Sequence, residues 1–78
     1  MKFTQYFLAS RNRPDRFIIK MEWIQLAITH PIRETIQADK RIRRWANIPE
    51  MNNKILRVVL LDDAETVHNA FFDRSFRE

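Results

Sequence analysis

The sequence contains no glycine and no cysteine among its 78 residues. Without glycine it cannot form the glycine-rich loops that bind phosphate groups, or the dinucleotide-binding fingerprint, which argues against a nucleotide-dependent enzyme. Without cysteine it can form neither disulfides nor thiolate metal sites, and this fits a reducing compartment. The two histidines, His30 and His68, show no metal-ligand spacing. We therefore expect neither a metal nor a cofactor.

Long apolar runs are missing as well. No stretch approaches the roughly 20 apolar residues of a membrane-spanning helix, and no signal-peptide pattern opens the chain. We therefore predict a cytoplasmic protein without a membrane partner. The length corresponds to a single domain, residues 1–78, and the content of hydrophobic and aromatic residues is sufficient for a compact core.

The protein is basic, with 14 lysines and arginines against 10 acidic residues and a formal net charge of +4. Ten of the basic residues are arginines, which are suited to bidentate contacts with phosphate or carboxylate groups. A small basic domain of this kind is a candidate for binding RNA or an acidic protein. A solvated basic surface without a partner is the alternative interpretation.

Hydrophobic periodicity predicts one clear helix. From Ile18 to His30 apolar residues recur at helical spacing, and Pro31 follows. The segment before it, residues 1–17, fits a short helix and an opening strand equally well. Both interpretations stay open there.

After Pro31 the period shortens toward two, which is typical of strands. Residues 32–38, 41–48 and 54–61 show this pattern, and a fourth strand is predicted within residues 65–76. Glu34 interrupts the apolar face of the first strand and indicates an edge position, whereas the third strand has a wholly apolar face and is predicted to be central. The fold class is therefore α+β, with one or two N-terminal helices packed on an antiparallel sheet of about four strands.

Turns without glycine must use asparagine, aspartate and proline. The best candidates are Asp39-Lys40, Asn52-Asn53 and Asp62-Asp63.

The last strand, ETVHNAFFDRSF, sets polar residues within a run of strand-forming ones, so the register of its hairpin decides which face they occupy. In an uninterrupted pairing His68, Phe72 and Arg57 share the open face, and Asn69 falls on the core face. A shift by one residue, as a bulged loop would cause, places Asn69 and Asp73 beside Arg57 and turns His68 inward. We favour the first register because tight even-length hairpins are common.

Three residues near this strand form the candidate catalytic set. His68 has a pKa near neutrality and is suited to act as a general acid or base, although a half-buried strand histidine is the structural alternative. Arg57 and Arg74 are candidate phosphate-binding residues. An ordinary surface pair between Asp73 and Arg74 is the alternative for the latter.

A second cluster suggests contact with nucleic acid. Arginines for phosphates beside a ring for stacking are typical of single-strand binding surfaces. Packing of the tryptophan across the sheet, with solvated arginines, is an equally good interpretation. The candidate nucleic-acid-binding residues are Arg41, Arg43, Arg44 and Trp45.

Four segments, EWIQLAITHP, RIRRWA, ILRVVLLDD and TVHNAFFDRSF, resemble in the same order a family of small uncharacterised bacterial proteins, over roughly residues 14–76. That family is distantly similar to the BrnT and RelE/ParE-like toxins of toxin–antitoxin pairs. The resemblance implies a helix-plus-antiparallel-sheet protein, ribonuclease activity and neutralisation by an acidic antitoxin-like protein. No motif of those toxins can be laid residue by residue onto this chain.

We therefore predict a toxin-like small basic protein that acts on RNA, a candidate ribonuclease. RNA suits a chain without a clear nucleophile, because its 2′-hydroxyl supplies one. The alternative is a non-catalytic module that binds nucleic acid or protein with the same arginine-rich surface.

Overall fold

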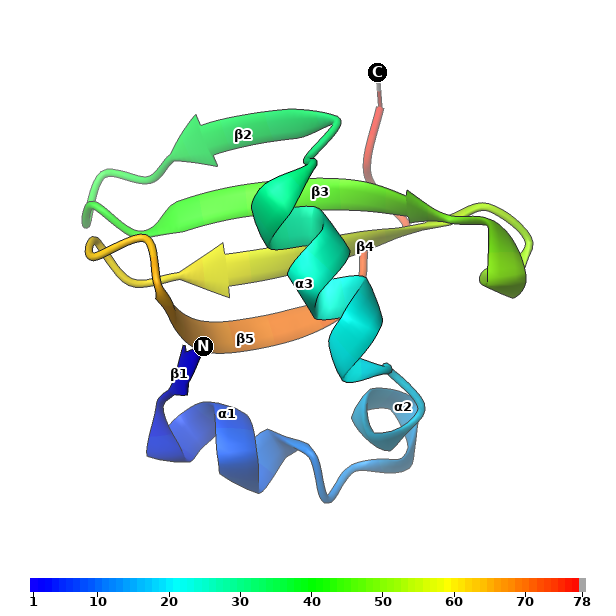
Figure 1. Ribbon diagram of the computed structural model, residues 1–78, viewed down its shortest axis with the longest axis horizontal. Helices are drawn as coiled ribbons and strands as arrows, with labels where there is room; N and C mark the ends of the chain where they lie inside the picture. Colours follow the sequence, from blue (N-terminus) through cyan, green and yellow to red (C-terminus); the bar gives the residue numbers. More distant parts are fainter. Residues whose placement is uncertain (78) are drawn as a thin grey trace.

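The elements follow the order that the hydrophobic pattern indicates, with helices before the main strands. The computed structural model describes residues 1–77 (Figure 1). The elements are β1 (Lys2–Phe3), α1 (Gln5–Ser10), α2 (Pro14–Phe17), α3 (Met21–Thr29), β2 (Arg33–Ile36), β3 (Ile42–Ile48), the 3-10 turn η1 (Pro49–Met51), β4 (Lys54–Leu60) and β5 (Thr66–Phe72). The α+β class is confirmed, and β1 adds a short strand to the four that were predicted.

The strands form one sheet in the order β1-β5-β4-β3-β2. β1 runs parallel to β5, and the other neighbours are antiparallel. The central position predicted for β4 is confirmed, since its apolar side chains Leu56, Val58 and Leu60 are fully buried. β2 lies at an edge with all four residues exposed, as the charge of Glu34 indicated.

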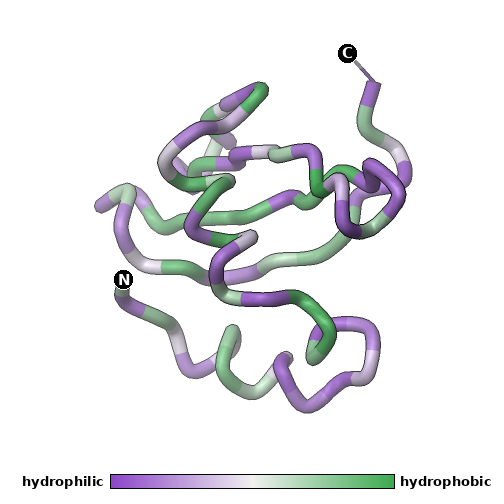
Figure 2. Tube along the Cα trace, turned by 45° about the vertical axis from the view of Figure 1, so that its right-hand side comes forward, coloured by the Kyte–Doolittle hydropathy of each residue, from purple (hydrophilic) through white to green (hydrophobic). Residues whose placement is uncertain are grey.

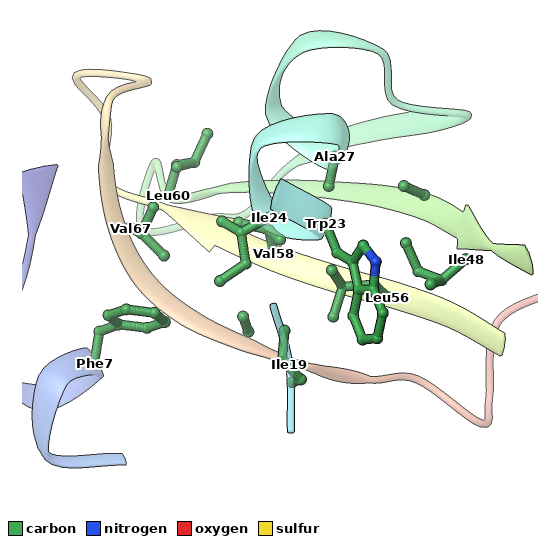
Figure 3. Close-up of a cluster of buried hydrophobic side chains, with 12 residues drawn as sticks. Phe7, Ile19, Trp23, Ile24, Ala27, Ile48, Leu56, Val58, Leu60 and Val67 are labelled. Atoms are coloured by element: carbon green, nitrogen blue, oxygen red, sulfur yellow. The ribbon is translucent and has the colours of Figure 1, made fainter. Parts of the chain in front are cut away.

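One face of the sheet is covered by α3, and the core lies between them (Figure 1). Trp23, Ile24 and Ala27 recur at helical spacing, and Figure 3 shows them directed from α3 toward the strands. Figure 2 shows hydrophilic residues through the link between α1 and α2, which lies outside this core. The buried core residues are Phe7, Ile19, Trp23, Ile24, Ala27, Ala46, Ile48, Leu56, Val58, Leu60, Val67 and Ala70.

The N-terminal segment contains both structures that its pattern allowed. Lys2 and Phe3 pair with β5, and the Thr4 side chain then caps α1 by accepting a hydrogen bond from the Phe7 amide at 3.1 Å. Pro14 begins α2, where its missing N–H is tolerated. The helix predicted from Ile18 begins only at Met21, because Ile18 instead ends α2 as its C-cap and Lys20, in extended backbone, is the N-cap of α3.

Turns without glycine are confirmed at all three predicted places. Asn52 and Asn53 both adopt left-handed backbone, with φ of 55° and 60°, which asparagine tolerates better than most residues. Lys40 and Ala64 also have positive φ, at 73° and 59°. In the turn that contains Ala64, Asp63 accepts hydrogen bonds from the side chain and amide of Thr66 and from the amide of Glu65. These bonds lower the pKa of Asp63 to about 2.

The β4–β5 hairpin follows neither of the two predicted registers throughout. Next to the turn the hairpin has the first, uninterrupted register, since Leu60 lies opposite Val67. A bulge then shifts the pairing by one residue, so that Val59 lies opposite Asn69 and Arg57 opposite Phe71. The core position predicted for Asn69 is therefore wrong, because the shift moves this residue to the face that carries Arg57.

Two further register predictions are corrected by the bulge. Phe72 does not share the face of Arg57, because it lies opposite Leu56 and packs against the core. His68 does not turn inward as the second register required, because it sits at the bulge with its ring stacked on the exposed Tyr6. The bulge thus turns both His68 and Asn69 away from the core.

Two kinds of feature are absent from residues 1–77. No helix there is long and apolar enough to cross a membrane. The same residues contain no group of three or more histidine, aspartate and glutamate side chains placed to hold a metal ion.

Candidate nucleic-acid interface

The sheet face opposite α3, here termed the open face, carries most of the predicted site. Side chains alternate across a strand, so β3 directs Ile42 and Ala46 toward α3 while Arg43 and Trp45 point the other way. The register brings residues of β2, β4 and β5 onto the same face. The open face consists of Arg33, Thr35, Arg41, Arg43, Trp45, Arg57, Val59, His68, Asn69 and Phe71.

Trp45 packs within this face, which is the structural alternative that its pattern left open. Its side chain is covered, with only 6% of the residue exposed. Its Nε1 donates a hydrogen bond to Oδ2 of Asp73 at 2.9 Å, and the Phe76 ring lies over it with 5.6 Å between centroids. The segment after β5, which passes behind the sheet in Figure 1, therefore covers the tryptophan.

Asp73 is held by donors from three parts of the chain. Besides the bond from Trp45, Oδ1 accepts hydrogen bonds from the amide of Ser75 at 2.9 Å and from its hydroxyl at 2.7 Å. Oδ2 lies 3.6 Å from Nη1 of Arg57. Burial acts to raise the pKa of Asp73, but the hydrogen bonds from Trp45 and Ser75 and the charge of Arg57 outweigh it and lower the pKa to about 2.

The guanidinium groups around Phe71 are packed on aromatic rings. The Cζ atom of Arg57 lies 5.1 Å from the ring centroid of Phe71 and 5.8 Å from that of Trp45. Arg16, from α2, lies 5.2 Å from the Phe71 centroid, and its Nη1 donates to Oδ1 of Asn69 at 2.6 Å. Stacking of this kind fixes the direction of the charged groups.

His68 lies in a hollow of about 470 Å³ on the open face, lined also by Arg41, Arg57 and Asn69. Its Nδ1 is 3.0 Å from the Thr4 hydroxyl, and the Tyr6 ring stacks on it with 4.9 Å between centroids. Partial burial, and then the positive charge of Arg41, lower the pKa of His68, against the opposite effect of Asp39. This shift favours the neutral ring, which is the form able to accept a proton.

Tyr6 also lines this hollow, although the sequence did not indicate it as a site residue. It comes from α1, outside the strands that carried the prediction, and only the parallel pairing of β1 with β5 brings α1 beside His68. The sequence held no signal for this contact, since a single tyrosine in an ambiguous segment has many possible places.

Arg44 and Arg74 do not join the other predicted residues. Arg44 points to the helix side, where its Nε contacts Glu34 at 2.6 Å and its Nη1 donates to the Ile28 carbonyl at 3.1 Å. Arg74 is exposed and lines a different hollow, between α2 and the segment after β5. Its predicted partner Asp73 pairs instead with Arg57. The structure therefore brings together Arg41, Arg43, Trp45, Arg57 and His68.

Comparison of the chain with protein-family models, with curated proteins and with solved structures gives no match. The similarity to toxins thus stays a prediction, and the arguments below rest on the geometry of the open face.

Chemically, the open face combines positive charge with aromatic surface. Three of its arginines, Arg33, Arg43 and Arg57, line a second hollow of about 390 Å³ together with Trp45. The Nε groups of Arg43 and Arg57 are buried and have no hydrogen-bond partner within residues 1–77. The guanidinium groups that line this hollow favour an anion with several acceptor oxygens, such as a phosphodiester.

Proposed function

We propose that this protein is a toxin-like small protein that binds single-stranded RNA across its open face. The observation that carries the proposal is the gathering of arginines from three neighbouring strands and from the turn before β3 on one face of the sheet. They are Arg33, Arg41, Arg43 and Arg57. Arginines can follow a phosphate backbone, and the rings of Tyr6 and Phe71 offer surface for unstacked bases.

Binding is tested by fluorescence anisotropy with a labelled oligouridylate of about 12 nucleotides. We expect Arg41→Gln and Arg43→Gln each to weaken binding about fivefold and to lower the slope of log K against log salt by about 0.7, as expected for one lost phosphate contact. Arg13→Gln is the matched control, because it removes the same charge from an exposed position before α2. Equal losses in all three variants would show that binding reflects net charge and not the open face.

A second function, cleavage of the bound RNA, is favoured by the placement of His68. Its ring shares a hollow with Arg41 and Arg57, and its lowered pKa favours the neutral form, so a phosphodiester bound there would lie close to a base. His68 would accept the proton of the 2′-hydroxyl, the 2′-oxygen would attack phosphorus, and the 5′-oxygen would leave with a proton from solvent. Arg57 would stabilise the negative charge on the phosphate oxygens.

Cleavage is tested by incubating RNA with wild type and His68→Ala and separating the products. We expect a 2′,3′-cyclic phosphate and a 5′-hydroxyl from wild type, and no product from His68→Ala, with RNA affinity unchanged within about twofold. Growth of a bacterial culture after induction of each form tests the toxin activity. Binding without any product from wild type would favour the non-catalytic module.

The proposed setting is the bacterial cytoplasm, with an acidic antitoxin-like protein as a partner. The support is the net charge of +4 and the absence of cysteine. Co-expression with the product of a neighbouring acidic gene tests it, since rescue of growth and co-purification are expected together.

A further inference from the structure

The donors around Asp73 form a small anion site on the open face. Trp45 Nε1 comes from β3, Arg57 Nη1 from β4, and the Ser75 amide and hydroxyl from the segment after β5. All of them converge on one carboxylate whose side chain is only 7% exposed. Carboxylates and phosphates accept hydrogen bonds from the same kinds of donor, and arginine binds both.

The Asp73 carboxylate leaves some donors of this anion site without a hydrogen-bond partner. Arg57 approaches it with a single terminal nitrogen at 3.6 Å, while its buried Nε has no partner within residues 1–77. Arg33 and Arg43 line the same hollow as Asp73. The Asp73 carboxylate therefore lies in a hollow lined by four arginines, Arg33, Arg43, Arg57 and Arg77, and forms an ion pair with Arg57. A phosphodiester with two free oxygens would complement this arrangement better.

The segment that carries Asp73 is attached to the open face by contacts near the surface. Phe76 packs on Trp45, the Cζ atom of Arg33 lies 4.8 Å from the Phe76 ring centroid, and Nη1 of Arg33 donates to the Arg77 carbonyl at 2.7 Å. Each of these contacts is individually weak in water. Local opening of such a segment requires much less free energy than unfolding of the sheet.

We propose that residues 73–77 are an internal occupant of a phosphodiester-binding site, in which the Asp73 carboxylate stands where a phosphate of the RNA backbone binds. Binding of RNA displaces the segment, frees the Trp45 ring for stacking against a base, and gives Arg57 a bidentate partner. Apparent affinity is then reduced by the fraction of molecules in which the segment is closed. This inference rests on the proposed function and adds an internal competitor for its ligand.

The test compares Asp73→Asn with Asp63→Asn in the anisotropy assay. The two aspartates are matched in their hydrogen bonding, since each accepts three hydrogen bonds and each has a pKa of about 2. Both variants raise the net charge by one, but only Asp73 faces the arginines of the open face. We expect Asp73→Asn to bind RNA about five- to tenfold more tightly than Asp63→Asn.

A second variant keeps the charge unchanged. Phe76→Ala removes the ring that holds the segment against Trp45, so about threefold tighter binding than wild type is expected. Circular dichroism checks that each variant is folded. If Asp73→Asn and Asp63→Asn differ by less than about twofold and Phe76→Ala has no effect, the inference is overturned, while RNA binding by wild type would leave the proposed function standing.

The indole N–H signal of Trp45 separates the two proposals directly. It is identified by its loss in Trp45→Phe, and it is followed in wild type while oligouridylate or inorganic phosphate is added. A shift with RNA supports the inference. A shift with phosphate alone, without RNA binding, would support the anion site and contradict the proposed function. No shift with either probe would overturn the inference.

Discussion

The two faces of the sheet differ in what holds them together, although strands β3, β4 and β5 contribute side chains to both. On the helix side, Leu56, Val58 and Leu60 are fully buried among apolar residues, and removal of this surface from water stabilises the fold. On the open face, arginine and aromatic side chains stack on each other, and the buried Nε groups of Arg43 and Arg57 have no hydrogen-bond partner within residues 1–77. The difference indicates that stability depends mainly on the helix side, while the proposed RNA binding would use the open face.

The largest expected effect tests stability. Leu56→Ala creates a cavity beneath α3 and should lower the free energy of unfolding by about 3 kcal/mol, because the residue is fully buried. Arg43→Ala, on the opposite side of the neighbouring strand, should change it by less than about 1 kcal/mol. Urea denaturation followed by tryptophan fluorescence measures both values. A loss in Arg43→Ala as large as in Leu56→Ala would contradict the division between the faces.

The next effect concerns the buried carboxylate of Asp73, which lies against the open face. The folded pKa of Asp73 is lowered from 3.8 to about 2, so its contribution to stability is present above pH 3.8 and is lost as the pH falls through the folded pKa. The shift corresponds to about 2 kcal/mol. Urea midpoints measured from neutral pH down to strongly acidic pH should therefore fall less steeply for Asp73→Asn than for wild type. Parallel curves would show that Asp73 is not held by its donors in solution.

The smallest effect concerns the titration of His68. Its folded pKa lies below the ordinary 6.5, so the stability that the neutral ring provides is present above pH 6.5 and is lost as the pH falls through the lowered value. The ring signal in an NMR titration should have a midpoint below 6.5 in wild type. In Arg41→Gln the midpoint should move upward, because a positive charge has been removed. An unchanged midpoint would show that the charge of Arg41 does not act on His68.

Sequence patterns predicted the elements well because each pattern reflects a local physical requirement. Helical spacing from Trp23 to Ala27, and the wholly apolar face of β4, were sufficient to place α3 and the central strand. The turns were found because a chain without glycine has few residues that tolerate left-handed backbone.

The predicted site was less complete, and Arg44 shows why. Its charge and that of Glu34 each interrupt an apolar face in the sequence. The register places them opposite each other, so that each compensates the other on the helix side. No local pattern connects two residues on different strands before the register is known.

By itself, the sequence determined the fold class, the central strand, the turns and the basic character of this protein, because these depend on the periodicity and chemistry of neighbouring residues. The tertiary structure alone decided which polar groups meet. The bulge placed His68 and Asn69 on the open face, the pairing of β1 with β5 brought Tyr6 to His68, and the final segment carried Asp73 to Trp45 and Arg57. These contacts join residues far apart in the chain, so they form only when the whole sheet has assembled.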